Sequence, residues 1–164
     1  MKDTSPKQDL PGDDFDGDLI LTFLTEFHLL EQALIRAGFT KMGRIHRNAQ
    51  ADWTRFVRHI ERRFDPDSSP ALQGAVSYLL YDPDKMAIRE QRLEDSLPGD
   101  ASSADSDILW LAELVQETRT RLTYGIPFLK ETSFDSAQVM AALMVLEAWA
   151  KCDPTIGQLL PHVQ

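Results

Sequence analysis

Apolar residues recur at helical spacing through most of the chain. The pattern predicts four main helices, from residue 16 or 18 to 37, at 50–64, at 105–123 and from 133 or 135 to 151. It also predicts a shorter helix at 70–81 and a short last turn that Asp153 caps and Pro154 begins. No segment alternates between apolar and polar residues as a half-buried strand does. We therefore expect an all-α fold over residues 15–164, an up-and-down bundle of four or five helices.

Three stretches fall outside this pattern. Residues 1–14 are acidic and rich in proline and serine, which is typical of a disordered tail. Gly38 is placed to stop the first helix, and the basic residues after it indicate a linker. Residues 82–104 form a long polar connection with at most a weak helical turn, and connections of this length are usually functional or mobile.

Two charges stand in the apolar faces of predicted helices. On a helical wheel, Glu31 falls inside the apolar arc of the first helix and Arg119 inside that of the helix at 105–123. An isolated buried charge costs several kcal/mol or more, so each needs a partner or a wet cleft. We expect Glu31 and Arg119 to face one another or a shared cleft, either as a structural ion pair or as part of a functional site.

The charge of the chain is strongly negative but uneven. The net charge is −9 and the pI is about 4.8, which opposes sequence-indifferent binding to nucleic acid. Seven of the seventeen Lys and Arg residues nevertheless lie between Lys41 and Arg63. The second helix carries one polar stripe opposite its apolar face: Arg55, Arg58, His59 and Arg62. This stripe is either a solvated face or a docking surface for RNA or an acidic segment.

Several other classes of function find no support in the sequence. No run approaches the roughly 18 to 20 apolar residues of a membrane span, and the N-terminus resembles neither a signal nor a transit peptide. A single cysteine, Cys152, fits a reducing compartment, so we expect a cytoplasmic protein. Because no phosphate-binding glycine loop and no metal-ligand spacing occur, we expect neither a cofactor nor a metal ion.

Four segments together resemble, in order, the helices of bacterial HEPN-domain proteins. They are "FLTEFHLLEQALIRAGFTK", "ADWTRFVRHIERRF", "TRTRLTYG" and "VMAALMVLEAWAKCDP", and the resemblance covers about residues 19–155. It implies a helical bundle that forms a homodimer. It also implies a metal-independent ribonuclease ancestry, in a bacterial defence, toxin–antitoxin or stress context.

The signature of that family is an arginine, a polar residue, three further residues and a histidine. In "RTRLTYG", Arg119 matches the arginine and Thr120 the polar residue, but Tyr124 stands where the histidine should be. The resemblance also implies that Glu31 faces the arginine. A neutral imidazole accepts a proton near pH 7, whereas a phenol, with an ordinary pKa of about 10, is a poor base there.

These observations lead to one main expectation and two alternatives. We expect a non-catalytic module that binds RNA or a protein partner, or that regulates one. An active endoribonuclease using Arg119 with Tyr124 is the first alternative, and a purely structural protein-interaction bundle is the second.

Overall fold

The computed structural model describes residues 17–43, 48–99, 102–124 and 136–161. The acidic tail expected at residues 1–14 lies outside this part of the chain. The elements follow in the order α1 (Gly17–Arg36), β1 (Thr40–Met42), β2 (Ala49–Ala51), α2 (Trp53–Ile60), α3 (Pro70–Tyr81), α4 (Pro83–Asp95), a 3-10 turn η1 (Ser103–Asp105), α5 (Asp107–Tyr124), α6 (Ser136–Cys152) and α7 (Pro154–Leu159). The all-α bundle expected from the sequence is confirmed.

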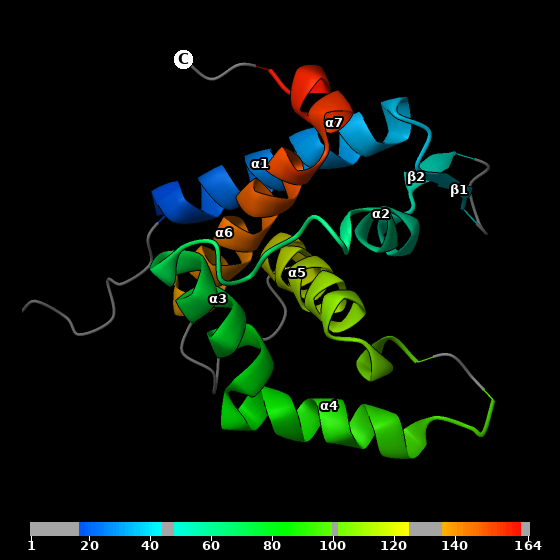
Figure 1. Cartoon of the computed structure of the whole chain (residues 1–164), viewed down its shortest axis with the longest axis vertical. Helices are drawn as coiled ribbons and strands as arrows, with labels where there is room; N and C mark the ends of the chain where they lie inside the picture. The colour runs from blue at the N-terminus through cyan, green and yellow to red at the C-terminus, as the bar shows by residue number, and fades with distance from the viewer. Residues whose placement is uncertain (1–16, 44–47, 100–101, 125–135, 162–164) are drawn as a thin grey trace, which may run out of the picture.

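Helix α6 lies at the centre of the packing. It makes the most extensive contacts of the fold, with α1 and α3, and it also contacts α2, α5 and α7 (Figure 1). Its small residues Ala141 and Ala142 are buried together with Val139, Val145 and Trp149, so more than one side of the helix is covered. The buried side chains of α1, α2, α3, α5, α6 and α7 form one core cluster.

Local sequence signals set several helix ends. Gly38 has a positive φ of 93° and ends α1, where its N–H donates to Ile35 and the next N–H donates to Leu34. The Ser69 hydroxyl accepts a hydrogen bond from the N–H of Leu72 at the start of α3. Pro70 occupies the first turn of that helix. The predicted stop at Gly38 and the predicted range of α3 are confirmed.

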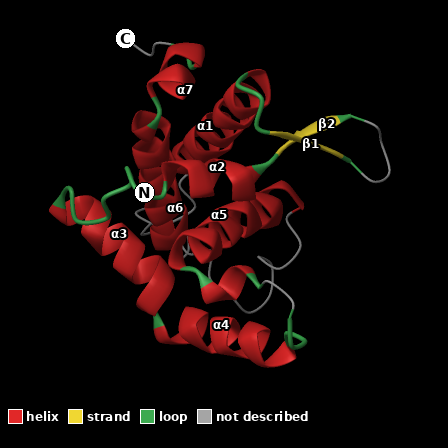
Figure 2. Ribbon diagram, turned by 45° about the vertical axis from the view of Figure 1, so that its right-hand side comes forward, coloured by secondary structure: helices red, strands yellow, loops and turns green. Residues whose placement is uncertain are grey.

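The expectation that the chain contains no strand is wrong in one place. Within the segment read as a basic linker, β1 and β2 pair antiparallel, with Lys41 opposite Gln50. Figure 2 shows this hairpin projecting beside α2, away from the bundle. Each strand has three residues, which is too short for an alternating pattern to be recognised. As a result α2 begins at Trp53, after the cap Asp52, and not at residue 50.

The expected polar connection at 82–104 is also wrong, because it contains the 13-residue helix α4. This helix lies at one end of the molecule, opposite α7, and among the described elements its most extensive contacts are with α3 and η1 (Figures 1 and 2). The side chains that α4 turns toward the body are cations. Lys85 is buried with its Nζ 4.1 Å from the ring centre of Tyr78.

Two arginines continue this inward row along α4. The Arg89 guanidinium forms an ion pair with Asp107 at 2.9 Å, and its Nε donates to the Ala104 carbonyl at 2.8 Å. Arg92 pairs with Glu113 and lies 5.8 Å from the ring centre of Trp110. Because cations and not apolar residues face inward, the helix has no apolar stripe for hydropathy to detect.

None of the described helices is long and apolar enough to cross a membrane.

The anchoring of α4 can be tested with Arg89→Ala. This variant removes one ion pair and one charge-assisted hydrogen bond from a mostly buried guanidinium, so α4 should lose about 1–3 kcal/mol of local stability. Hydrogen exchange followed by mass spectrometry should show faster exchange over residues 83–95, with the core helices little changed.

A matched control is Arg121→Ala, which removes a more exposed ion pair with Glu117 within α5. Such a pair contributes about 0.3–0.5 kcal/mol. Unchanged exchange over residues 83–95 in Arg89→Ala would contradict the anchoring role.

Candidate functional site

The last two turns of α5 carry the residues that match the ribonuclease signature. Arg119 and Tyr124 are five residues apart on one helix, so their side chains leave the axis about 140° apart. Tyr124 is 64% exposed, whereas Arg119 is half-buried. The Thr120 hydroxyl donates to the Gln116 carbonyl at 3.0 Å and so hydrogen-bonds its own helix. Within one chain, these three groups do not converge on a common point.

Arg119 has an aromatic partner. Its Cζ lies 5.6 Å from the ring centre of Phe27 on α1, in the geometry of a cation–π contact. Phe27 in turn stacks on Trp53, with ring centres 5.0 Å apart and planes at 29°. Both rings are buried, so the guanidinium lies over the edge of the aromatic core.

Glu31 stands one turn beyond Phe27 on α1 and is half-buried. Among the residues that the structure describes, no ion pair joins Glu31 to Arg119. The two charges lie on contacting helices, and both side chains are half-buried. Arg119 contacts the Phe27 ring, so an aromatic side chain is its described partner.

The polar stripe of α2 divides into two pairs. Arg55 donates to the Gly38 carbonyl at 3.2 Å and lies over Phe39, and His59 donates to Asp153 at 3.0 Å. Arg58 and Arg62 are exposed, and within the described ranges neither forms an ion pair. Within this stripe, Arg58 and Arg62 are therefore the cations that remain available for an external anion.

Asp153 joins α2, α6 and α7. Burial raises the pKa of this carboxyl, but hydrogen bonds from the backbone of Thr155, from His59 and from the backbone of Ile156 outweigh burial and lower the pKa below its usual value. The bond from the Thr155 N–H, at 2.8 Å, also caps α7 as the sequence predicted.

Two further titratable groups lie nearby. Burial, together with the charge of Glu147, raises the pKa of Glu26 on α1. Burial also raises the pKa of the Cys152 thiol, against the opposing effect of Arg63, and the thiol donates to the Ala148 carbonyl at 3.2 Å. A half-buried thiol with a raised pKa is a poor nucleophile, so Cys152 acts in packing.

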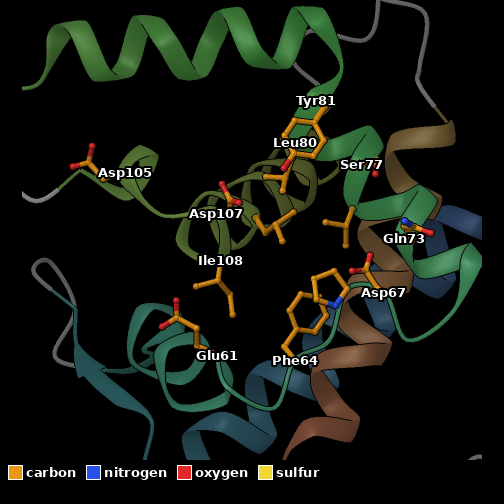
Figure 3. Close-up of a pocket in the computed structure, with 13 residues that line it drawn as sticks. Glu61, Phe64, Asp67, Gln73, Ser77, Leu80, Tyr81, Asp105, Asp107 and Ile108 are labelled. Atoms are coloured by element: carbon orange, nitrogen blue, oxygen red, sulfur yellow. The ribbon is translucent and has the colours of Figure 1, made fainter.

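The structure reveals a cleft that the sequence did not indicate. It has a volume of about 740 Å³ and opens between the end of α2, the outer side of α3 and the start of α5. Figure 3 shows Phe64 and Ile108 directed toward its centre, with Glu61, Asp67, Asp105 and Asp107 distributed around it. The sequence contained one sign of this cleft, namely acidic residues next to three predicted helix ends. Only the packing of the helices brings those ends together.

No group of three or more His, Cys, Asp or Glu side chains in the described ranges could hold a metal ion. Comparison with known proteins adds no assignment, since no family model, curated protein or solved structure matches the chain.

The Asp153 hydrogen bonds predict an acid-sensitive contribution to stability. Since the folded-state pKa is lowered, the contribution is complete above the unfolded-state value of about 4 and is lost as the pH falls through the folded-state value. Urea denaturation between about pH 3 and pH 7 measures the free energy of unfolding. This free energy should fall more steeply with decreasing pH in the wild type than in Asp153→Asn.

The alanine variant separates charge from capping. Asp153→Ala should also lose about 1 kcal/mol at neutral pH, because the α7 cap disappears. If the free energy of unfolding had the same pH dependence in the wild type and in Asp153→Asn, the role assigned to the carboxylate would be contradicted.

Proposed function

We propose that this protein is a HEPN-like helical module that has lost the ribonuclease reaction and acts by binding a partner. The observation that carries the proposal is the side chain of Tyr124, a largely exposed phenol at the position of the signature histidine. A neutral imidazole accepts a proton near pH 7, whereas a phenol is a poor base there. Arg119 keeps the cation of the signature, and it lies against Phe27.

The surroundings of Thr120 support the same proposal. This residue lines a hollow of about 490 Å³ together with Glu113 and Glu117. Each of these carboxylates already pairs with an arginine, Arg92 and Arg121 respectively. An anionic scissile phosphate would meet carboxylates there and no unpaired arginine among the lining residues.

The HEPN-like resemblance, the homodimer and the bacterial defence, toxin–antitoxin or stress context rest on the quoted sequence segments. Within this proposal the bundle functions as a homodimer of 18.6 kDa chains. Light scattering coupled to gel filtration measures that assembly directly.

The loss of catalysis is tested with single-stranded and structured RNA. The wild type and Arg119→Ala should both leave the RNA at the no-protein background. Tyr124→His should gain metal-independent cleavage, since the imidazole restores the base that the signature lacks. Circular dichroism of all three proteins verifies that the helices are intact.

The two possible contradictions differ in meaning. Cleavage by wild type that vanishes in Arg119→Ala would establish an active enzyme and overturn the proposal. Absence of RNA cleavage by Tyr124→His would remove the HEPN-like ancestry from the proposal. The proposal of a binding module would remain.

RNA binding is a second candidate, favoured by the exposed Arg58 and Arg62 on α2. Arg58→Glu/Arg62→Glu should weaken RNA binding by about tenfold or more and should lower the salt slope of the affinity by about one to two. Arg36→Glu/Lys151→Glu changes the same charge at exposed positions elsewhere and serves as the control. Fluorescence anisotropy with labelled RNA makes the comparison, and equal losses in both variants would exclude a specific α2 surface.

A further inference from the structure

The cleft between α2, α3 and α5 combines an apolar floor with an acidic rim. The floor includes Phe64, Leu80 and Ile108, and Tyr81 forms part of one wall (Figure 3). Tyr81 is 58% exposed, although its neighbour Leu80 is buried. An aromatic side chain left open beside a hollow of about 740 Å³ offers contact area to a partner.

The charges around this floor are all of one sign. Glu61, Asp67, Asp105 and Asp107 line the cleft, and no lysine or arginine is among its lining residues. Arg89 offsets the charge of Asp107 from the α4 side. The other three carboxylates have no ion pair among the described residues.

We propose that this cleft docks a basic amphipathic segment of a protein partner. The apolar side chains of the segment would cover Phe64, Ile108 and Tyr81, and its lysines or arginines would meet the carboxylates of the rim. This inference rests on the proposed binding function and names the chemistry of the partner. Charge complementarity selects the occupant, because opposite potentials steer association and like charges oppose it.

The other classes of occupant fit the cleft less well. RNA would bring phosphates to four carboxylates. A second copy docked cleft to cleft would oppose two acidic rims, in a chain whose net charge is −9. A small polycation would satisfy the rim but leave the apolar floor uncovered. A segment with cations spaced around apolar anchors satisfies both features.

The probe is a fluorescein-labelled helical peptide of about 15 residues, with leucines on one face and lysines on the other. A scrambled peptide of the same composition has the same charge without the apolar face. Fluorescence anisotropy with the full-length protein should show saturable binding of the amphipathic peptide and at least about tenfold weaker binding of the scrambled one.

The variants separate the cleft from the overall charge of the protein. Glu61→Lys/Asp105→Lys reverses two exposed rim charges and should weaken binding by about tenfold or more. Glu90→Lys/Glu94→Lys makes the same charge change on α4, outside the cleft lining, and should change the affinity by less than about threefold. Tyr81→Ser should weaken binding in high salt as well as in low salt, since it removes apolar contact.

Three peptide-binding results would overturn the proposal: equal losses in the cleft and α4 variants, equal binding of the scrambled peptide, or no binding of the amphipathic peptide. Self-association lost only in Glu61→Lys/Asp105→Lys would assign the cleft to a second copy and would also overturn it. Failure of the peptide to bind the cleft would not change the result of the RNA-cleavage test. RNA cleavage by wild type would instead remove the proposed function without altering peptide binding.

Discussion

The arrangement of the bundle depends on the burial of α6. This helix has apolar side chains on more than one side, and its alanines let neighbouring helices approach closely. Burying both sides requires α1 and α3 to flank it, while α5 and α2 complete the core. Trp149, fully buried on α6 and in edge-on contact with Phe64, extends that packing to the segment between α2 and α3. The cleft lies where this segment meets α3 and the start of α5, so its floor is continuous with the core.

A different kind of interaction holds α4. Lys85, Arg89 and Arg92 connect it to Tyr78, Asp107 and Glu113 through cation–π contacts and ion pairs, in place of an apolar stripe. Because these cations turn inward, the acidic residues of α4 remain on its exposed surface. The same inward arginines leave fewer free cations for a nucleic acid than the composition implies. Electrostatic pairing inside the chain therefore shapes what the outer surface can bind.

Most of the helices could be predicted because apolar residues recur at helical spacing along their buried faces. Gly38 marked a helix end through its conformational freedom and Asp153 through capping, and both effects act locally. The hairpin could not be predicted because its strands are too short to show an alternating pattern. Helix α4 could not be predicted because charged side chains, and not an apolar stripe, attach it to the bundle. At the candidate site, the sequence predicted that Arg119 and Glu31 face one another or a shared cleft, and it did not indicate Phe27 as the partner of Arg119. That partner, Phe27, looked like ordinary core, and cation–π pairing has no signature in spacing alone.

The three tryptophans also make the molecule an optical reporter of its own state. Trp53, Trp110 and Trp149 are all buried, and in the described residues the indole N–H groups of Trp110 and Trp149 have no hydrogen-bond partner. Indoles in such dry surroundings emit at shorter wavelength than indoles in water. Each also reports on a different neighbour: Trp110 lies beneath Arg92 of α4, Trp149 touches Phe64 at the cleft, and Trp53 stacks on the ring below Arg119. Single-tryptophan versions of the protein would therefore give separate fluorescence signals for α4, for the cleft and for Arg119.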